Sequence, residues 1–141
     1  RYTGVTFRNQ VTDTPEQNVF TFRNQYNGGG VAVGDLNGDG LPELVFTANQ
    51  GGARLYLNAG RFRFQDVTRE AGVGGNGAWT TGVTMADVNG DGRLDVYVCH
   101  SGLDAAKRRN ELWVNQGNGP GGVPRFKDLA AEYGVAGGGY G

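Results

Sequence analysis

The sequence predicts an all-β fold made of β-propeller-type blades, and three observations support this prediction. First, 27 of the 141 residues are glycines, well above the average usage of about 7%, which favours short strands joined by tight turns. Second, a loop rich in Asp, Asn and Gly occurs twice, starting at Asp35 and again 52 residues later at Asp87. Third, the segments around both loops carry the β-branched and aromatic pattern of strands. A repeat of this length with four strands per unit is typical of propeller blades.

Each unit contains four strand-like segments in the same order. The residues before the loop, 30–35, match 82–87, and those after it, 44–48, match 96–100. Two further pairs follow, 54–58 with 111–115 and 64–68 with 126–130. We therefore predict two four-stranded antiparallel blades, with strands over 30–35, 43–48, 53–58, 62–68, 81–86, 94–100, 110–115 and 125–130. Short amphipathic turns are expected at 69–72 and 131–134.

The repeat also predicts how the chain is divided. Residues 1–25 form an N-terminal segment, in which 2–6 resembles the closing strand of a blade. Blade repeats cover 26–72 and 73–135, and residues 136–141 begin a further repeat. Two blades cannot close a propeller ring, and their open edges and faces need cover. We therefore expect either a segment of a longer chain or a subunit that its neighbours complete.

The two loops predict calcium sites. Each places an oxygen-bearing side chain at loop positions 1, 3, 5 and 9 and glycine at positions 4 and 6, where the chain must turn tightly. Hard oxygen donors suit Ca²⁺ and suit neither zinc nor copper. Position 7 contributes its backbone carbonyl. The predicted ligands of two ions are Asp35, Asn37, Asp39, Leu41 and Glu43 in the first loop, and Asp87, Asn89, Asp91, Arg93 and Asp95 in the second.

Three other interpretations fit these loops less well. A solvated turn would explain one copy but explains two copies in register poorly. An EF-hand needs flanking helices and a Glu at position 12, where this chain has Phe46 and Val98. A dockerin-type loop fails for the same lack of a following helix. The loops are therefore expected between strands.

Charge and cysteine content bear on the environment of the chain. Six of its 14 acidic residues lie in the two loops, so each loop carries a charge of −3 while the rest of the chain is basic. This self-repulsion predicts that folding and metal binding are coupled. Free calcium is scarce in the cytosol, so the loops favour a secreted, cell-surface or periplasmic location. The single Cys99 cannot form an internal disulfide.

The chain resembles FG-GAP/VCBS repeats in three motifs. They are the loop pattern hydrophobic-Asp-x-Asn-Gly-Asp-Gly-x-x-(Asp/Glu), Leu-Tyr-Leu-Asn at 55–58 and Phe-Gln-Asp-Val-Thr at 64–68. The sequence at 26–31 and 82–92 is similar to that of the bacterial CRTAC/ASPIC-UnbV type of VCBS-repeat protein. The resemblance implies calcium-binding propeller blades, as in integrin α-subunits and many secreted bacterial proteins. It implies an extracellular scaffold and no defined reaction. Glu43 departs from the usual Asp at position 9, and Gly4 stands where Asp66 and Asp128 recur.

Catalytic candidates are few, and the chain is not expected to be an enzyme. His100 is the only histidine and has no partner fixed by sequence, and Cys99 lies in an apolar segment. The aromatic residues could stack on sugars but are more often blade packing. The basic run 107–109 is expected to be a solvated loop tip, because it lacks the aromatic interleaving of a nucleic-acid site. No apolar run approaches the roughly 20 residues of a membrane span.

The sequence leaves three functions open. The main hypothesis is a calcium-stabilised structural, adhesion or interaction module. The alternatives are an accessory propeller fragment of a larger secreted carbohydrate-acting enzyme and a self-assembling filament or oligomer subunit. The expected partners are the remaining blades of the parent chain or other copies of this chain. A protein or glycan ligand also stays open.

Overall fold

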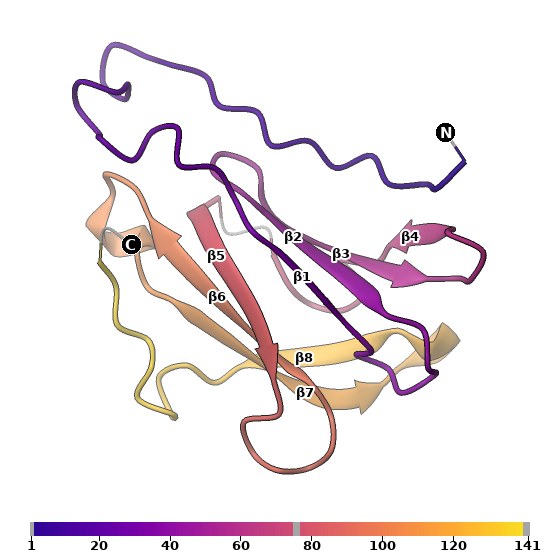
Figure 1. The fold of residues 1–141 in the computed structure, drawn as a ribbon. Coiled ribbons are helices and arrows are strands. Elements are labelled where there is room, and N and C mark those ends of the chain that lie inside the picture. The colour runs from indigo at the N-terminus through magenta and orange to yellow at the C-terminus, as the bar shows by residue number, and fades with distance from the viewer. Residues whose placement is uncertain (1, 75–76, 140–141) are drawn as a thin grey trace.

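Two four-stranded antiparallel sheets make up the computed structural model, which describes residues 2–74 and 77–139 (Figure 1). The strands of each sheet lie in chain order, so each sheet is a simple meander. The first sheet contains β1 (Val31–Gly34), β2 (Glu43–Ala48), β3 (Gly52–Asn58) and β4 (Phe64–Asp66). The second contains β5 (Trp79–Ala86), β6 (Asp95–Ser101), β7 (Glu111–Asn118) and β8 (Pro124–Asp128), with the short 3₁₀ turns η1 (Ala105–Lys107) and η2 (Pro120–Gly122) in its connections.

This architecture confirms the predicted all-β fold of two propeller-type blades that leave the ring open. Seven of the eight strands that the structure describes begin and end within two residues of the predicted bounds. The largest difference is at β7, which continues three residues beyond the predicted end. The register of β7 and β8 shifts after Asn115, and pairing then resumes between Asn118 and Pro124. A β-bulge, which the sequence pattern did not reveal, therefore extends this hairpin.

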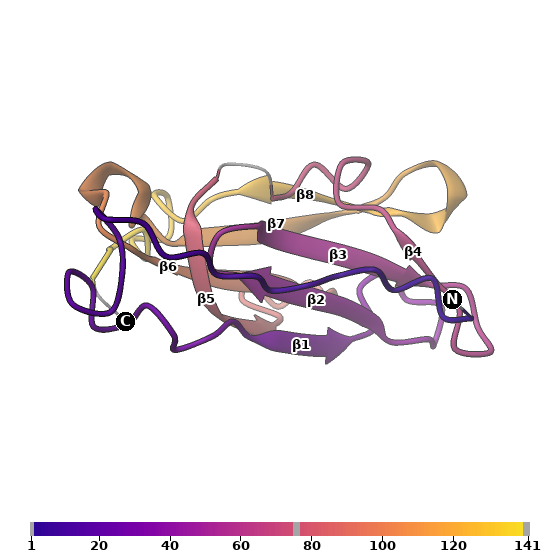
Figure 2. The ribbon, with the colours of Figure 1, turned by 90° about the horizontal axis from the view of Figure 1, so that it is seen from above.

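The two sheets share one hydrophobic core. Alternate residues of β2 and β3, including Val45 and Leu55, face alternate residues of β6 and β7, including Val96, Val98 and Trp113. All five are 3% exposed or less. Figure 2 shows the sheets as neighbouring layers, with β3 running beside β7 in that view. The burial of these side chains holds the blades together.

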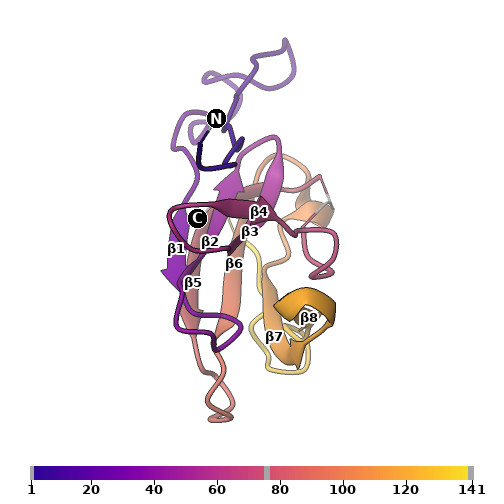
Figure 3. The ribbon, with the colours of Figure 1, turned by 90° about the vertical axis from the view of Figure 1, so that its right-hand side faces the viewer.

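The first strands of the two sheets lie close together. β1 contacts β5, and Figure 3 shows both on the same side of the molecule, from which the sheets spread toward β4 and β8. A glycine at the end of β1 permits this approach. A Cβ added at Gly34 would lie 2.8 Å from both Met85 Sδ and Leu94 Cδ1. The sheets therefore converge at β1 and β5.

The N-terminal segment covers the outer face of the first sheet, opposite the shared core (Figure 1). The Phe7 ring stacks on Phe46 with 4.8 Å between centroids, and Asn9 Nδ2 donates to Asn49 Oδ1 at 3.0 Å. Residues 2–6, predicted to resemble a closing strand, are not assigned as a strand. They contribute one backbone bond to the sheet, from Phe64 N to Thr3 O at 2.7 Å.

Helical turns follow both sheets at equivalent positions. Ala71 N donates to Val67 O at 2.8 Å, and 62 residues later Tyr133 N donates to Leu129 O at 3.0 Å. This match confirms the turns predicted at 69–72 and 131–134. None of the helical segments within the described ranges has the length and apolar character required to cross a bilayer.

We predict that Leu55→Ala destabilises the chain by about 2–5 kcal/mol, because it leaves a cavity between the sheets. Leu55 is completely buried in the shared core, whereas Leu103 is 44% exposed in a loop. Urea unfolding followed by circular dichroism measures both variants. Leu103→Ala, the control, should change the free energy of unfolding little. Equal effects of the two substitutions would show that the sheets do not share this core.

Candidate metal-binding loops

The two predicted metal loops connect β1 to β2 and β5 to β6 (Figure 1). Both therefore join the first and second strands of a sheet. The glycines at positions 4 and 6 have left-handed backbones, with φ of +78° and +84° in the first loop and +76° and +84° in the second. Only glycine adopts this conformation readily. The two loops consequently have the same path.

In the first loop the acidic side chains accept hydrogen bonds from the loop's own backbone. Asp35 at position 1 accepts from Gly38 N at 2.7 Å and from Gly40 N at 2.9 Å. Asp39 at position 5 accepts from Leu41 N at 2.8 Å. These bonds wind the loop around its own oxygen atoms.

The second loop repeats this pattern position by position. Asp87 accepts from Gly90 N at 2.7 Å and from Gly92 N at 2.8 Å. Asp91 accepts from Arg93 N at 2.9 Å. In both loops the amide oxygen at position 3 accepts from the N–H at position 5, at 3.1 Å and 3.0 Å. The spacing in the sequence therefore encodes a reproducible local structure.

The carboxylates at position 9 have a different environment, because both are buried. Glu43 is 0% and Asp95 is 1% exposed. Glu43 accepts from Leu36 N at 2.8 Å and from Asn58 N at 3.3 Å, and Asp95 accepts from Val88 N at 3.0 Å and from Asn115 N at 2.7 Å. Each carboxylate thus joins position 2 of its loop to the third strand of the sheet, at Asn58 or Asn115. We call this arrangement the position-9 clasp.

The asparagine that ends each third-strand motif completes the clasp. Asn58 Nδ2 donates to Pro42 O at 2.9 Å, and Asn115 Nδ2 donates to Leu94 O at 3.2 Å. Both acceptors lie at position 8 of a loop. The recurring Asn at 58 and 115 is therefore explained by a role in holding the metal loop to its own sheet. This asparagine recurs in the sequence repeat, but the repeat pattern alone does not reveal its role.

Electrostatics differ among the carboxyl groups of the loops. Burial raises the pKa of Glu43, and the charges of Asp39 and Asp35 add to the shift, while the N–H groups of Leu36 and Asn58 oppose it. The N–H of Arg93 is the main cause that lowers the pKa of Asp91. The Arg93 guanidinium also contacts Asp91, with Nη2 2.7 Å from Oδ2. The second loop thus carries an internal cation, whereas the first has Leu41 at that position.

The donor set fits a hard cation. Within the described ranges, no three His, Cys, Asp or Glu side chains form a ready metal-binding group. The reason is that position 3 is an amide and position 9 is turned toward backbone N–H groups. However, an ionised carboxylate has about four acceptor positions, and Asp35 uses two of them. The residues that could hold a cation are those predicted, namely Asp35, Asn37, Asp39, Leu41 and Glu43, and Asp87, Asn89, Asp91, Arg93 and Asp95.

The first loop is also docked on the second sheet. Asn115 Nδ2 donates to Leu36 O at 2.8 Å, and Asn118 Nδ2 donates to Asn37 O at 2.7 Å. Asn37 Nδ2 in turn donates to Gly122 O at 3.1 Å. These bonds cross from loop 1 to β7 and the turn before β8. Sequence reasoning missed them, because residues about 80 positions apart meet only when the sheets pack.

Comparisons with known proteins agree with this repeat. Residues 35–98, which contain both loops, match the family model described as FG-GAP-like repeat. Cartilage acidic protein 1 of Xenopus tropicalis is 32% identical over 110 residues. The matched part is 77% of this chain, and it covers 16% of the length of that relative. Both findings support the FG-GAP family.

The residues outside the metal loops that could carry chemistry mostly pack inside the sheets. His100 is buried, with Nε2 3.1 Å from Glu111 Oε2, and Trp113 Nε1 donates to the same oxygen at 3.2 Å. Burial raises the pKa of the half-buried Cys99 thiol, which disfavours the thiolate. Tyr56 packs edge-on against Phe46 with 5.9 Å between centroids. These contacts are those of blade packing.

We predict that Asn115→Ala lowers the free energy of unfolding by about 1–3 kcal/mol, because it removes the donor to the buried Leu36 carbonyl and to the partly buried Leu94 carbonyl. The equivalent variant Asn58→Ala is the matched control, since Asn58 Nδ2 bonds to Pro42 O at an exposed site and makes no bond between sheets. Urea unfolding of both variants measures the difference. An equal or larger loss for Asn58→Ala would contradict the role assigned to the Leu36–Asn115 bond.

Proposed function

We propose that this chain is a calcium-stabilised structural or interaction module of the FG-GAP type that acts outside the cell and is not an enzyme. The observation that carries the proposal is that the two loops repeat the same hydrogen-bond pattern at positions 1, 3, 5 and 9. Each combines exposed oxygen donors with a buried position-9 clasp. A loop that concentrates three carboxylates on a hydrogen-bonded frame is suited to a divalent cation.

Two Ca²⁺ ions are expected, one in each loop. Asp35, Asn37, Asp39 and the Leu41 carbonyl would hold the first, with Glu43 behind them, and Asp87, Asn89, Asp91, the Arg93 carbonyl and Asp95 would hold the second. The ion supplies positive charge that cancels the repulsion within the loop. The protein supplies the preformed turn and the clasp to the third strand. Calcium would therefore fix the ends of three strands in each sheet.

The two sites should differ in affinity. Arg93 places its guanidinium on Asp91, whereas the first loop has the uncharged Leu41 at position 7. A cation in the second loop must compete with this charge. An exposed ion pair is weak because solvent screens it, so the second loop is expected to bind calcium only modestly more weakly.

Support for an extracellular location comes from the loops and the family resemblance. Millimolar calcium is available outside cells. The chain resembles FG-GAP/VCBS repeats, which occur in integrin α-subunits and in secreted bacterial proteins. The relative from Xenopus tropicalis is named for cartilage. The bacterial type inferred from the sequence stays a prediction. A role as an accessory domain of a carbohydrate-acting enzyme is not the function that we propose.

We predict that the chain binds two Ca²⁺ ions and that excess chelator markedly lowers its melting temperature, because the loop charges then repel one another. Isothermal titration calorimetry should report one remaining site in Asp39→Ala and one in Asp91→Ala. Asp39→Ala, which keeps only the second loop, should show the weaker site.

Two results would contradict the calcium assignment. One is a melting temperature that chelator does not change. The other is a variant that still binds two ions, which would exclude the mutated loop. Asp13→Asn, outside both loops, is a matched control that removes one acidic charge.

The partner proposal rests on an apolar groove on the outer face of the second sheet. The groove has a volume of about 420 Å³ and is lined by β5, β6, β7 and the C-terminal turn, including Tyr97, Leu112 and Val135. Equivalent positions of the first sheet face the second sheet. Position 2 of the loops is 2% exposed at Leu36 but 42% exposed at Val88. We infer that a further repeat unit covers this groove as the second sheet covers the first.

A second copy of this chain fits the groove less well than a further repeat. The face that the second sheet presents to the first carries Val98 and Trp113. The equivalent residues in the first sheet are Phe46 and Tyr56, and the N-terminal segment already covers them through Phe7. The N-terminal segment therefore caps one end of the repeat array.

We predict that the chain is a monomer in calcium and that deleting residues 1–10 makes it associate head to tail, because the deletion exposes the face of Phe46. Light scattering coupled to size-exclusion chromatography measures the mass. Val135→Glu in the deletion variant should restore the monomer by placing a charge in the groove. A folded deletion variant that stays monomeric would contradict the proposed complementarity of the two faces.

A further inference from the structure

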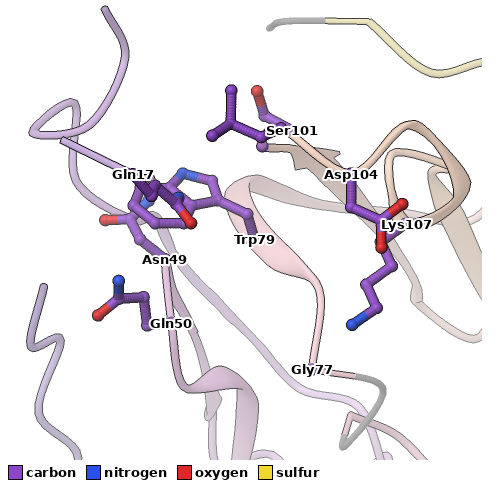
Figure 4. A pocket seen from close by; sticks show the side chains of 10 residues that line it. Gln17, Asn49, Gln50, Gly77, Trp79, Ser101, Asp104 and Lys107 are labelled. Atoms are coloured by element: carbon purple, nitrogen blue, oxygen red, sulfur yellow. The ribbon is translucent and has the colours of Figure 1, made fainter. Parts of the chain in front are cut away.

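Figure 4 shows a polar cavity of about 200 Å³. It lies at the ends of β5 and β6 that are opposite the second metal loop. β5 starts at this cavity with Trp79, and β6 returns to it with Ser101. Asp104 and Lys107 line it from the connection between β6 and β7. Gln17, Asn49 and Gln50 line it from the N-terminal segment and the β2–β3 turn. Three separate parts of the chain thus converge on one cavity.

Two buried polar groups in this cavity have no partner among the residues that the structure describes. They are the indole N–H of Trp79 and the hydroxyl of Ser101. Trp79 is 6% and Ser101 is 1% exposed. Buried polar groups are nearly always hydrogen-bonded, and one without a partner costs free energy. This pair therefore points to a molecule in the cavity that accepts a hydrogen bond from Trp79 and exchanges one with Ser101.

The positions of both groups are fixed by packing. Trp79 and Ser101 are directly paired across β5 and β6. The Trp79 ring makes an edge contact with Phe22, with 5.4 Å between centroids. Gly102 has φ of +101°, and a Cβ added there would lie 2.9 Å from Trp79 Cβ. The loop can close over Trp79 only because residue 102 is glycine.

We propose that this cavity binds a single neutral sugar residue, such as the end of a glycan. Trp79 Nε1 would donate to a sugar oxygen, and Ser101 would donate to, or accept from, a neighbouring hydroxyl. The cavity is lined by one carboxylate, Asp104, and one ammonium, Lys107. These opposite charges can bond to hydroxyls, which both donate and accept, and they give no preference for a charged ligand.

The size of the cavity also favours a small ligand. Sites for drug-sized molecules have volumes of about 300–1,000 Å³, so this cavity accommodates one ring rather than an extended chain. The expectation that Trp79 serves only blade packing is therefore incomplete. Its ring packs against Phe22, but Trp79 also lines the cavity, and its N–H has no partner in the described part of the chain.

This inference deepens the proposed interaction module by giving it a ligand class, and it can fail independently of the calcium sites. The sugar cavity and the loops lie at opposite ends of β5 and β6. Loss of sugar binding would leave the two calcium sites unchanged in calorimetry. Loss of the calcium sites would appear in calorimetry without sugar.

The test is an NMR titration of the full 141-residue chain in calcium buffer. The sequence has two tryptophans, so its ¹H–¹⁵N spectrum contains two indole signals. Trp113 Nε1 is bonded to Glu111 and serves as the internal reference. The probes are glucose, galactose, mannose and N-acetylglucosamine, with glucuronate, glucosamine and glycerol for comparison. At least one neutral sugar should shift the Trp79 signal saturably while the Trp113 signal stays in place.

Variants then test the assigned contacts. Ser101→Ala should weaken binding about fivefold, the effect of one hydrogen bond. Lys107→Gln should also weaken it, whereas Lys127→Gln, an exposed lysine on β8, should not. The unchanged Trp113 signal verifies that each variant is folded.

Three results would overturn the proposal. The first is a Trp79 signal that no neutral sugar saturates, which would mean that the cavity holds water only. The second is a response to glucuronate or glucosamine alone, or an equal response to glycerol. The third is unchanged sugar affinity in both Ser101→Ala and Lys107→Gln when these variants are folded.

Discussion

The structure depends on a buried carboxylate at position 9 of each loop. Glu43 and Asp95 each accept a backbone N–H from their own loop and another from the third strand of the sheet. A buried charge is costly unless such donors satisfy it. The same bonds that offset this cost also hold the loop, the second strand and the third strand in one arrangement. The exposed oxygen donors of the loop are rigid because the clasp beneath them is rigid.

Equivalent residues of the two sheets have unequal environments, so the outer faces of the two sheets differ. Leu36 is buried under the second sheet, whereas its counterpart Val88 is exposed beside an apolar groove. Asn115 joins both loops, whereas its counterpart Asn58 serves only one. The first unit is covered on both faces, by the N-terminal segment and by the second sheet. The second unit has one covered face and one available face.

Much of the fold could be predicted because the information is local and occurs twice. The glycines at positions 4 and 6 can take the left-handed backbone, the acidic residues can bond to nearby N–H groups, and strand residues alternate between faces. Two copies in register reduced the chance that either pattern was accidental. The predicted ligand residues follow the same local logic. In contrast, residues 7–25 have no counterpart in the second unit, and the packing of Phe7 on Phe46 could not be predicted.

The sequence by itself determined the repeat, the strands and the oxygen donors of the two loops, since each depends on residues within about ten positions of one another. Only the tertiary structure decided which carboxylates are buried, because Glu43 and Asp95 are satisfied by the distant N–H groups of Asn58 and Asn115. It also decided that Trp79 and Ser101 present unpaired polar atoms to one cavity. Contacts between residues so distant in the sequence depend on how the sheets pack, and local sequence patterns do not predict them.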